Sequence, residues 1–327
     1  MKIGIPKTLF FYTYLPFWKS FFQELGCEVV ISGNTNKEIL DLGVRDAVND
    51  ACVPIKVYHG HVAYLKDKVD YIFSPRIVSV RRLGTETFCP KFLGLPDMIR
   101  FSINGLPPLI DVRIDLKKGV NRLLHVCLEV GNLLDKSRNL ILKAYRRANL
   151  YQGEFDSLKL KGFMPDEALD ILENGMSVDS DIKAEGEVTI GVVGYPYILY
   201  DRFINLGLMK KLRAMGVKII TPELIPDEIL NQHIKKLPKY LFWHYSHRVI
   251  GAALYFMENP KIDGIIHVSA FACGPDSMTG KLIELEAKNR KGVNFMVLTI
   301  DENLGEAGII TRIEAFVDMI KYRRNLL

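Results

Sequence analysis

Three of the five cysteines in this 327-residue chain share a local sequence pattern. Cys52, Cys89 and Cys273 each precede a proline by one or two positions, in the segments CVP, CP and CGP, and a helix is expected to follow each of them. Proline suits the first turn of a helix because its missing N–H is not needed there. The three sulfurs are therefore expected near helix N-termini, where the helix dipole and free N–H groups favour a thiolate.

Three thiolates could together bind a metal centre. The spacings, with 36 and then 183 residues between them, match no local metal motif, so three unrelated loop cysteines remain the alternative. A 4Fe–4S cluster on three cysteines would leave one iron without a protein sulfur, open to water or a substrate oxygen. Zinc on three cysteines is the competing assignment. Cys27 begins an apolar segment and Cys127 lies on an apolar helical stripe, so both are predicted to be core residues.

Charged residues near predicted strand ends are further candidates. Arg76, Arg81 and Arg82 follow the strand DYIFS, and they could bind a phosphate or an acyl-CoA, offset cluster charge, or lie in a solvated loop. Glu306, in the last predicted helix, is a candidate proton donor, with helix capping and ion pairing as the alternative.

Two other motifs are assigned no cofactor. His59 and His61 would diverge by about 200° on a helix, so surface or supporting positions are expected for them. The segment GPDSMTGKL, residues 274–282, has five residues between its glycines and ends in leucine, so it is not a P-loop. If ATP supplies energy, it is expected to act on a partner.

The elements that must position these residues occur twice in the same order. Four short apolar segments in the first half match four in the second: 2–6 with 189–194, 27–32 with 217–221, 69–73 with 262–266, and 109–115 with 295–301. Members of the last pair end at Asp115 and Asp301. Strands that alternate with helices indicate parallel sheets. The pattern predicts an α/β protein of two Rossmann-like domains related by duplication, with chance similarity as the alternative.

We expect three regions: a Rossmann-like domain over 1–115 with Cys52 and Cys89, a helical connector and linker over 116–187, and a second Rossmann-like domain over 188–327 with Cys273. Apolar spacing predicts an amphipathic helix within 116–150. Ligands bind outside the carboxyl ends of parallel strands, so a site is expected in a cleft between the domains.

Composition narrows the class of protein. The chain is 48% hydrophobic and 25% charged, with a net charge of +5 and no zinc-finger spacing or RNP motif, so nucleic-acid binding is not expected. It has neither a signal-peptide pattern nor an apolar run long enough to span a membrane, which favours the cytoplasm. Five cysteines there are packing, reactive or metal-binding residues rather than disulfides.

Several longer segments resemble the activase-related branch of the 2-hydroxyacyl-CoA dehydratase superfamily. They are CVPIKVYHGHVAYL, DYIFSPR, FCPKFLGLPDMI, GVVGYPYILYDRFINLGLMKKL, SAFACGPDS and DENLGEAGIITRIEAF, and they cover nearly all of the chain outside 120–185. The superfamily includes dehydratase subunits, benzoyl-CoA reductase subunits and double-cubane cluster proteins. The resemblance implies Rossmann-like domains and an oxygen-sensitive 4Fe–4S cluster, and the family's cysteine ligands fall on Cys52, Cys89 and Cys273.

The resemblance also implies a function and partners. A separate ATP-hydrolysing activator would supply low-potential electrons, and the open iron would reduce or dehydrate a small substrate such as an acyl-CoA. The dehydratases use two different subunits, so a second subunit or a homodimer is expected, and the double-cubane proteins use more cysteines than this chain offers. The alternatives are a non-catalytic electron-transfer or cluster-handling partner of a larger enzyme, and a cluster-free Rossmann-like binding protein.

Overall fold

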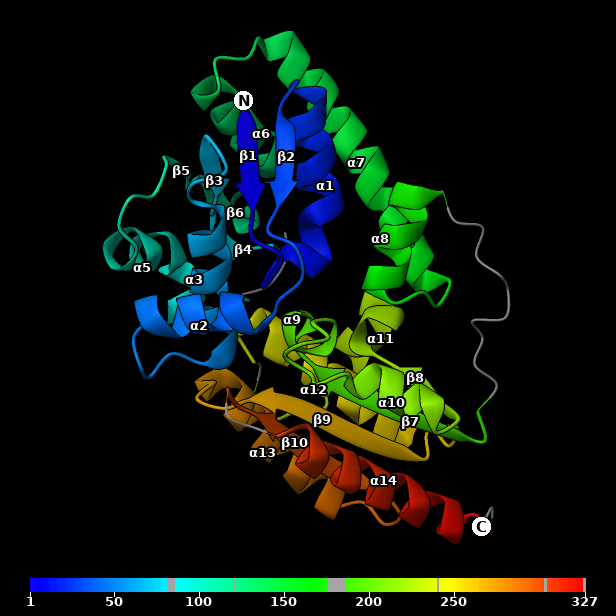
Figure 1. Ribbon diagram of the computed structural model, residues 1–327. Coiled ribbons are helices and arrows are strands. Elements are labelled where there is room, and N and C mark those ends of the chain that lie inside the picture. The colour runs from blue at the N-terminus through cyan, green and yellow to red at the C-terminus, as the bar shows by residue number, and fades with distance from the viewer. Residues whose placement is uncertain (81–85, 120, 176–185, 240, 303–304, 326–327) are drawn as a thin grey trace. The chain divides into compact units, whose positions relative to one another are not determined.

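The computed structural model describes residues 1–80, 86–119, 121–175, 186–239, 241–302 and 305–325 (Figure 1). They form two compact units. The first unit comprises Met1–Leu158 with Phe242–His244, and the second comprises Lys159–Leu241 with Tyr245–Leu327. This division falls inside one long helix, whereas the division expected from the sequence sets the helices of 116–187 apart as a connector. Residues 176–185, which belong to the predicted connector and linker, lie outside the described residues.

The first unit is built on a parallel sheet with the strand order β2-β1-β3-β5. Its strands are β1 (Lys2–Ile5), β2 (Glu28–Ile31), β3 (Tyr71–Phe73) and β5 (Leu109–Ile110). The chain moves from β1 outward to β2 and then back across β1 to β3. Since such crossovers are right-handed, α1 (Phe11–Glu24) covers one face and α2 (Lys37–Asp46) with α3 (Val53–Leu65) covers the other.

The rest of the first unit differs from the sequence prediction in two places. The remaining elements are β4 (Arg76–Ser79), α4 (Pro90–Leu93), α5 (Leu95–Ser102), β6 (Arg113–Asp115), η1 (Leu116–Lys118), α6 (Arg122–Leu133) and α7 (Arg138–Leu160). The strand expected over 109–115 is interrupted: β5 ends at Ile110 in the main sheet, while Asp115 ends β6, which pairs only with β4. The helix expected within 116–150 breaks into α6 and α7 around Asp135, which has a positive φ of 54°.

The second unit has the parallel strand order β8-β7-β9-β10. Its elements are α8 (Pro165–Asn174), β7 (Val188–Gly194), α9 (Pro196–Leu199), α10 (Leu208–Ala214), β8 (Val217–Ile220), η3 (Pro222–Leu224), α11 (Asp227–Ile234), α12 (His244–Glu258), β9 (Gly264–Ala270), α13 (Gly274–Lys288), β10 (Phe295–Ile300) and α14 (Glu306–Arg323). Two short helices, α9 and α10, follow β7 and are separated by turns.

The two sheets repeat one topology, with β1, β2, β3 and β5 in the places of β7, β8, β9 and β10. The α/β prediction is confirmed, and the common strand order supports duplication. The two units also share a pair of adjacent helices, which the sequence did not indicate: α2 with α3 in the first unit corresponds to α11 with α12 in the second. Each pair crosses closely at a glycine: an added Cβ at Gly60 would lie 1.8 Å from the Ile39 carbonyl oxygen, and one at Gly251 would lie 3.0 Å from that of Leu230.

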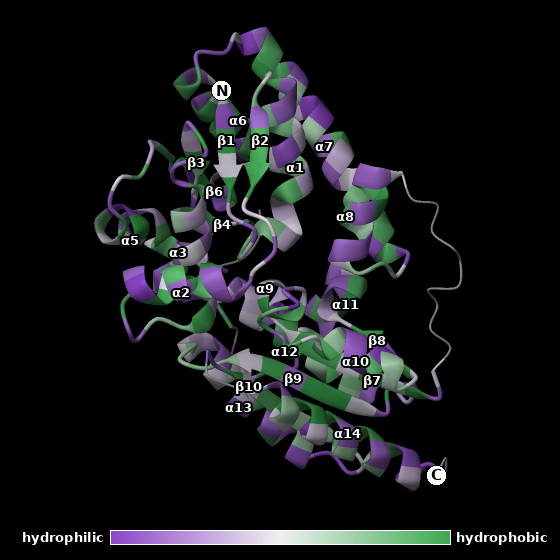
Figure 2. Cartoon of the chain, viewed as in Figure 1, coloured by the Kyte–Doolittle hydropathy of each residue, from purple (hydrophilic) through white to green (hydrophobic). Residues whose placement is uncertain are grey.

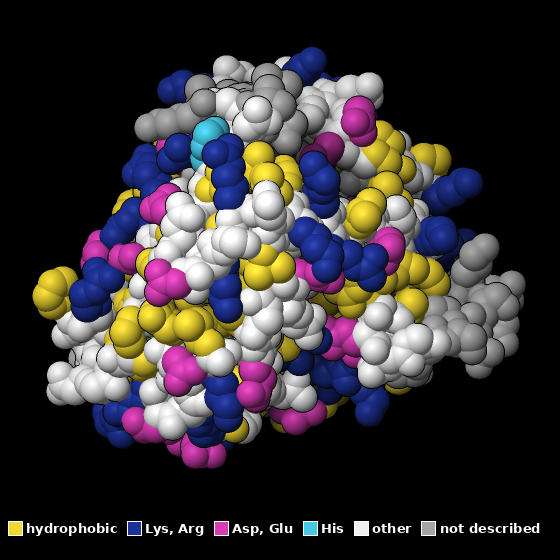
Figure 3. Space-filling view, turned by 90° about the horizontal axis from the view of Figure 1, so that it is seen from above, with side chains coloured by type: hydrophobic (Ala, Val, Ile, Leu, Met, Phe, Trp, Pro, Cys, Tyr) yellow, Lys and Arg dark blue, Asp and Glu magenta, His cyan; other side chains and the backbone are white. Residues whose placement is uncertain are grey.

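The distribution of side chains follows these layers. Figure 2 shows that apolar residues dominate the central strands of each unit, while the helices alternate between apolar and polar positions. Buried strands that pack on both faces require such apolar runs. On the face seen in Figure 3, lysine and arginine side chains are interspersed with aspartate and glutamate. Within the described residues, no helix combines the length and apolarity needed to cross a membrane.

Candidate metal centre

Cys52, Cys89 and Cys273 each occupy the residue directly before a helix, at the starts of α3, α4 and α13. Each has an extended backbone, and a proline lies in the first turn of the helix that follows. The prediction that a helix begins at each of these cysteines is therefore confirmed. Their role as metal ligands stays a prediction.

Cys52 and Cys89 both belong to the first unit and lie close enough for their charges to interact. The Lys91 ammonium, in the first turn of α4, donates to the Asp50 carbonyl oxygen at 2.7 Å. This bond ties the start of α4 to the loop that leads into Cys52. The Ile55 N–H, which donates to the Cys52 carbonyl oxygen at 2.9 Å, also lowers the pKa of the Cys52 thiol. The N–H groups of Lys91 and Phe92, in the first turn of α4, have the same effect on the pKa of Cys89.

The protonation of these two thiols qualifies one expectation. Burial raises the pKa of Cys52 and of Cys89, and it outweighs the backbone N–H groups and the Lys91 ammonium, which lower the pKa of each. The helix starts therefore favour thiolates, as predicted, but burial outweighs them, and without a metal the pKa of each thiol lies above its ordinary value. Metal binding displaces the thiol proton, and the same N–H groups and ammonium would then stabilise the bound thiolates.

Cys273 belongs to the second unit, where it follows β9 and is 8% exposed. Three residues later, in the first turn of α13, an oxygen of the Asp276 carboxyl group forms a hydrogen bond with His267 Nε2 of β9 at 3.0 Å. Both side chains are fully buried. Among the described residues, neither His267 Nδ1 nor the second Asp276 oxygen has a hydrogen-bond partner. This pair fixes the helix start that carries Cys273 to the central strand of its sheet.

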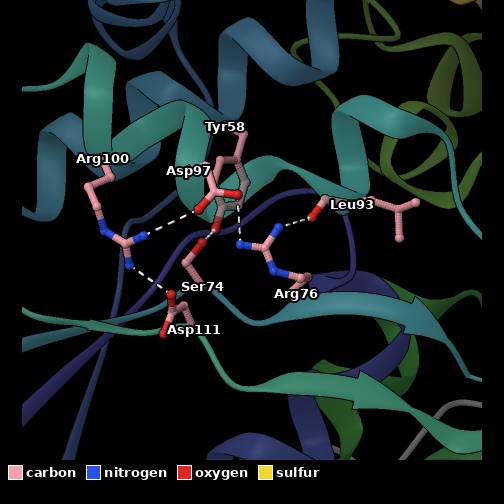
Figure 4. A network of polar contacts seen from close by, with 7 residues as sticks. All are labelled: Tyr58, Ser74, Arg76, Leu93, Asp97, Arg100 and Asp111. Carbon is pink, nitrogen blue, oxygen red and sulfur yellow. Dashed lines mark hydrogen bonds and ion pairs between the residues drawn. The ribbon is translucent and has the colours of Figure 1, made fainter.

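Arg76 anchors α4 at the end opposite Cys89 (Figure 4). Its guanidinium donates to the Leu93 carbonyl oxygen at 2.9 Å and to Asp97 of α5 at 2.7 Å. In the same region the Tyr58 hydroxyl of α3 donates to Ser74 at 2.7 Å, at the end of β3. Arg76 was a candidate ligand for phosphate or acyl-CoA, but here it is engaged by the protein. Arg81 and Arg82 lie outside the described residues.

The two histidines of α3 are buried, which excludes the surface alternative predicted for them and leaves the supporting one. His59 Nδ1 lies 2.8 Å from the Ile55 carbonyl oxygen one turn earlier. His61 bonds through both ring nitrogens, Nδ1 with Ser32 at 2.7 Å and Nε2 with Thr35 at 3.0 Å. Burial and, to a smaller extent, the positive charge of Lys7 lower the pKa of His61 to about 3. A neutral His61 therefore fastens α3 to the loop after β2.

The remaining sequence candidates fall into ordinary structural environments. Cys27 and Cys127 are 6% and 0% exposed, as predicted for core residues, and burial raises the pKa of both thiols. Glu306 is the first residue of α14 and forms an ion pair with Lys211 at 2.8 Å, with its side chain 64% exposed. Its role as a proton donor stays a prediction.

A second buried histidine–carboxylate pair was also missed from the sequence. Glu86, three residues before Cys89, lies 2.8 Å from His244 Nδ1, and both belong to the first unit. The two residues are 158 positions apart, so no local periodicity could join them. One sequence signal could have drawn attention to these carboxylates: Glu86 lies three residues before Cys89, and Asp276 lies three residues after Cys273.

Within the part of the chain that is described, no group of three or more histidine, cysteine, aspartate or glutamate side chains is arranged to hold a metal ion. What each unit supplies is clear. The first offers two neighbouring sulfurs at helix starts, and the second offers one sulfur in the same local structure. Sulfur ligands with adjacent backbone N–H donors are the donor set that iron–sulfur clusters use, so the residues present fit that cofactor chemically.

Comparison with known protein families gives two matches. Residues 2–225, which include Cys52 and Cys89, match the family described as CoA enzyme activase uncharacterised domain. Residues 213–320, which include Cys273, match the 2-hydroxyglutaryl-CoA dehydratase, D-component. No curated protein matches the chain. The first match covers more than half of the chain, so the protein belongs to the CoA enzyme activase uncharacterised domain family, among the proteins related to the 2-hydroxyacyl-CoA dehydratases.

Proposed function

We propose that this chain is a cytoplasmic, anaerobic redox protein that binds one 4Fe–4S cluster through Cys52, Cys89 and Cys273. It takes low-potential electrons from an ATP-hydrolysing activator and acts on a small substrate, such as an acyl-CoA, at an iron that lacks a protein sulfur. The observation that carries the proposal is the local structure common to the three cysteines. Each lies at a helix start with proline in the first turn.

The residues of the chain would hold the cluster and stabilise its charge. Backbone N–H groups at the helix starts favour the thiolate at two of the sulfurs, that of Ile55 at Cys52 and that of Phe92 at Cys89. The Lys91 ammonium favours the thiolate at both positions. When bound, such a cluster supplies one-electron chemistry and a Lewis-acidic iron. Cys52 and Cys273 are buried and Cys89 is half-buried, which limits access of water and oxygen to the sulfurs and suits an oxygen-sensitive cofactor.

The substrate and partner follow from the family matches rather than from the geometry. Residues 213–320 match a dehydratase component whose name specifies 2-hydroxyglutaryl-CoA, so this thioester is the first substrate to test. Residues 2–225 match a family named for activation of CoA enzymes, which supports an activator partner. We also propose that the chain acts as a homodimer or with a second subunit, which light scattering of the anaerobic protein would test.

The decisive assay combines reduction and turnover. The anaerobically purified chain is mixed with ATP and the activator of a 2-hydroxyacyl-CoA dehydratase, and the cluster is followed by electron paramagnetic resonance, with titanium(III) citrate as a control reductant. ATP-dependent reduction together with conversion of 2-hydroxyglutaryl-CoA to an enoyl-CoA and water supports the proposal. Reduction without turnover indicates an electron carrier instead. A chain that neither reductant reduces contradicts both roles.

A further inference from the structure

A three-residue segment from the second half of the sequence packs into the first unit, beside the loop that carries Cys89. The segment is Phe242–His244, which we call the clasp. It pairs in parallel with Thr87: the Thr87 N–H donates to the Phe242 carbonyl oxygen at 2.6 Å, and the His244 N–H donates to the Thr87 carbonyl oxygen at 2.8 Å. The clasp thus holds the backbone two residues before Cys89.

The side chains of the clasp add a buried charged contact. His244 Nδ1 lies 2.8 Å from Glu86 Oε2, and the side chains of His244 and Glu86 are only 8% and 1% exposed. Burial of a carboxylate is strongly unfavourable unless the group is paired and hydrogen-bonded. The imidazole therefore helps to satisfy the buried Glu86 carboxyl group, and release of the loop would be coupled to loss of this contact.

The same imidazole also contacts Phe88, the residue directly before Cys89. The His244 ring lies 5.4 Å from the Phe88 ring, which stacks on Phe92 of α4 at 4.7 Å. Contacts from His244 thus reach Glu86, Thr87 and Phe88, the three residues directly before Cys89.

We propose that the buried Glu86–His244 pair is a positioning device that holds Cys89 in the orientation for metal binding. This inference rests on the proposed function, since it assumes that Cys89 is a ligand. Glu86 and His244 act through the loop and are not themselves ligands. Arg76 secures the C-terminal end of α4, so the clasp and Arg76 together fix both ends of the helix that begins after Cys89.

The test measures the reactivity of each cysteine in the metal-free full chain under anaerobic conditions. Iodoacetamide labelling is followed by mass spectrometry of the peptides that contain Cys89, Cys27 and Cys127. Loss of a buried charged hydrogen bond makes local opening easier, so Glu86→Ala should speed labelling of Cys89 by about tenfold. Glu86→Gln, whose amide oxygen can still accept from an imidazole N–H, should restore most of the protection.

The two core cysteines separate local release from unfolding. Accelerated labelling of Cys89 with unchanged labelling of Cys27 and Cys127 supports the proposal. An unchanged rate at Cys89, or equal acceleration at all three cysteines, overturns it. His244→Ala provides a second variant, and the double variant with Glu86→Ala should label no faster than either single variant, because both remove the same contact.

Iron binding distinguishes this proposal from the proposed function. Ferrous iron and sulfide are added to the wild-type chain and to Glu86→Ala, and the rate of iron loss to a chelator is measured. Faster loss from Glu86→Ala, by about the factor seen in labelling, supports the positioning role. A wild-type chain that binds no iron contradicts the proposed function but leaves the labelling result, and with it the clasp's control of Cys89, intact.

Discussion

Mild acid should destabilise this chain through His61, the buried histidine that fastens α3 behind Cys52. Burial holds the pKa of His61 at about 3 in the folded chain, against 6.5 for an unperturbed histidine. Because the folded-state pKa is the lower one, the unfolded chain takes up the extra proton first. Stability from this group is therefore fully present above pH 6.5 and is lost as the pH falls from 6.5 toward 3.

The size of the effect follows from the same two values. Between about pH 7.5 and about pH 5, protonation of the unfolded state alone costs about 2 kcal/mol of the free energy of unfolding. The folded-state pKa lies well below this range, so the folded chain takes up almost no proton across it. His61 is 0% exposed, so solvent screening does not reduce the figure.

Urea denaturation at the two pH values measures this contribution. His61→Asn removes the titrating ring, so the variant should lose about 2 kcal/mol less than the wild type between about pH 7.5 and about pH 5. His125, which is exposed on α6, provides the matched control, and His125→Asn should keep the wild-type dependence. If His61→Asn and the wild type lose equal stability, the imidazole is not held neutral by burial, and the reasoning is wrong.

Two further predictions concern the helices that carry Cys52 and Cys89. Gly60→Ala would place a Cβ 1.8 Å from the Ile39 carbonyl oxygen and should cost about 3 kcal/mol in urea denaturation, whereas Gly153→Ala, in open space on α7, should stabilise by up to about 1 kcal/mol. Equal effects of the two substitutions would contradict the close crossing of α2 and α3. Arg76→Lys cannot make both of the guanidinium's bonds and should lose about 1 kcal/mol in the same assay. A variant as stable as the wild type would show that Arg76 does not anchor α4.

Much of the fold was predictable because it depends on patterns a few residues long. Apolar runs alternating with helical periodicity identified all four strands of each sheet, and their repetition anticipated the common strand order. The errors occurred where local patterns leave the conformation open. The segment 109–115 is apolar enough for one strand, yet it divides between two sheets. The apolar stripe within 116–150 does not reveal that the helix is interrupted between α6 and α7, where Asp135 adopts a positive φ.

The candidate site was predictable in its helix starts but not in its supporting contacts. Proline after cysteine located all three helix N-termini, since proline restricts the backbone locally. The partners of those helix starts come from distant sequence positions. His244 contacts Glu86 across 158 residues. For His61 the surface and supporting alternatives both stayed open, because its hydroxyl partners, Ser32 and Thr35, lie in another loop. The balance between burial and N–H donors at Cys52 also depends on packing that a sequence does not specify.

The central claim is that Cys52, Cys89 and Cys273 bind one iron–sulfur cluster, and its most direct test is metal and sulfide analysis of the anaerobically purified chain. The account predicts about four irons and about four sulfides per chain, loss of both in Cys273→Ala, and retention of both in the core variant Cys127→Ala. Stoichiometric zinc without sulfide, or a full complement of iron and sulfide in Cys273→Ala, would contradict it.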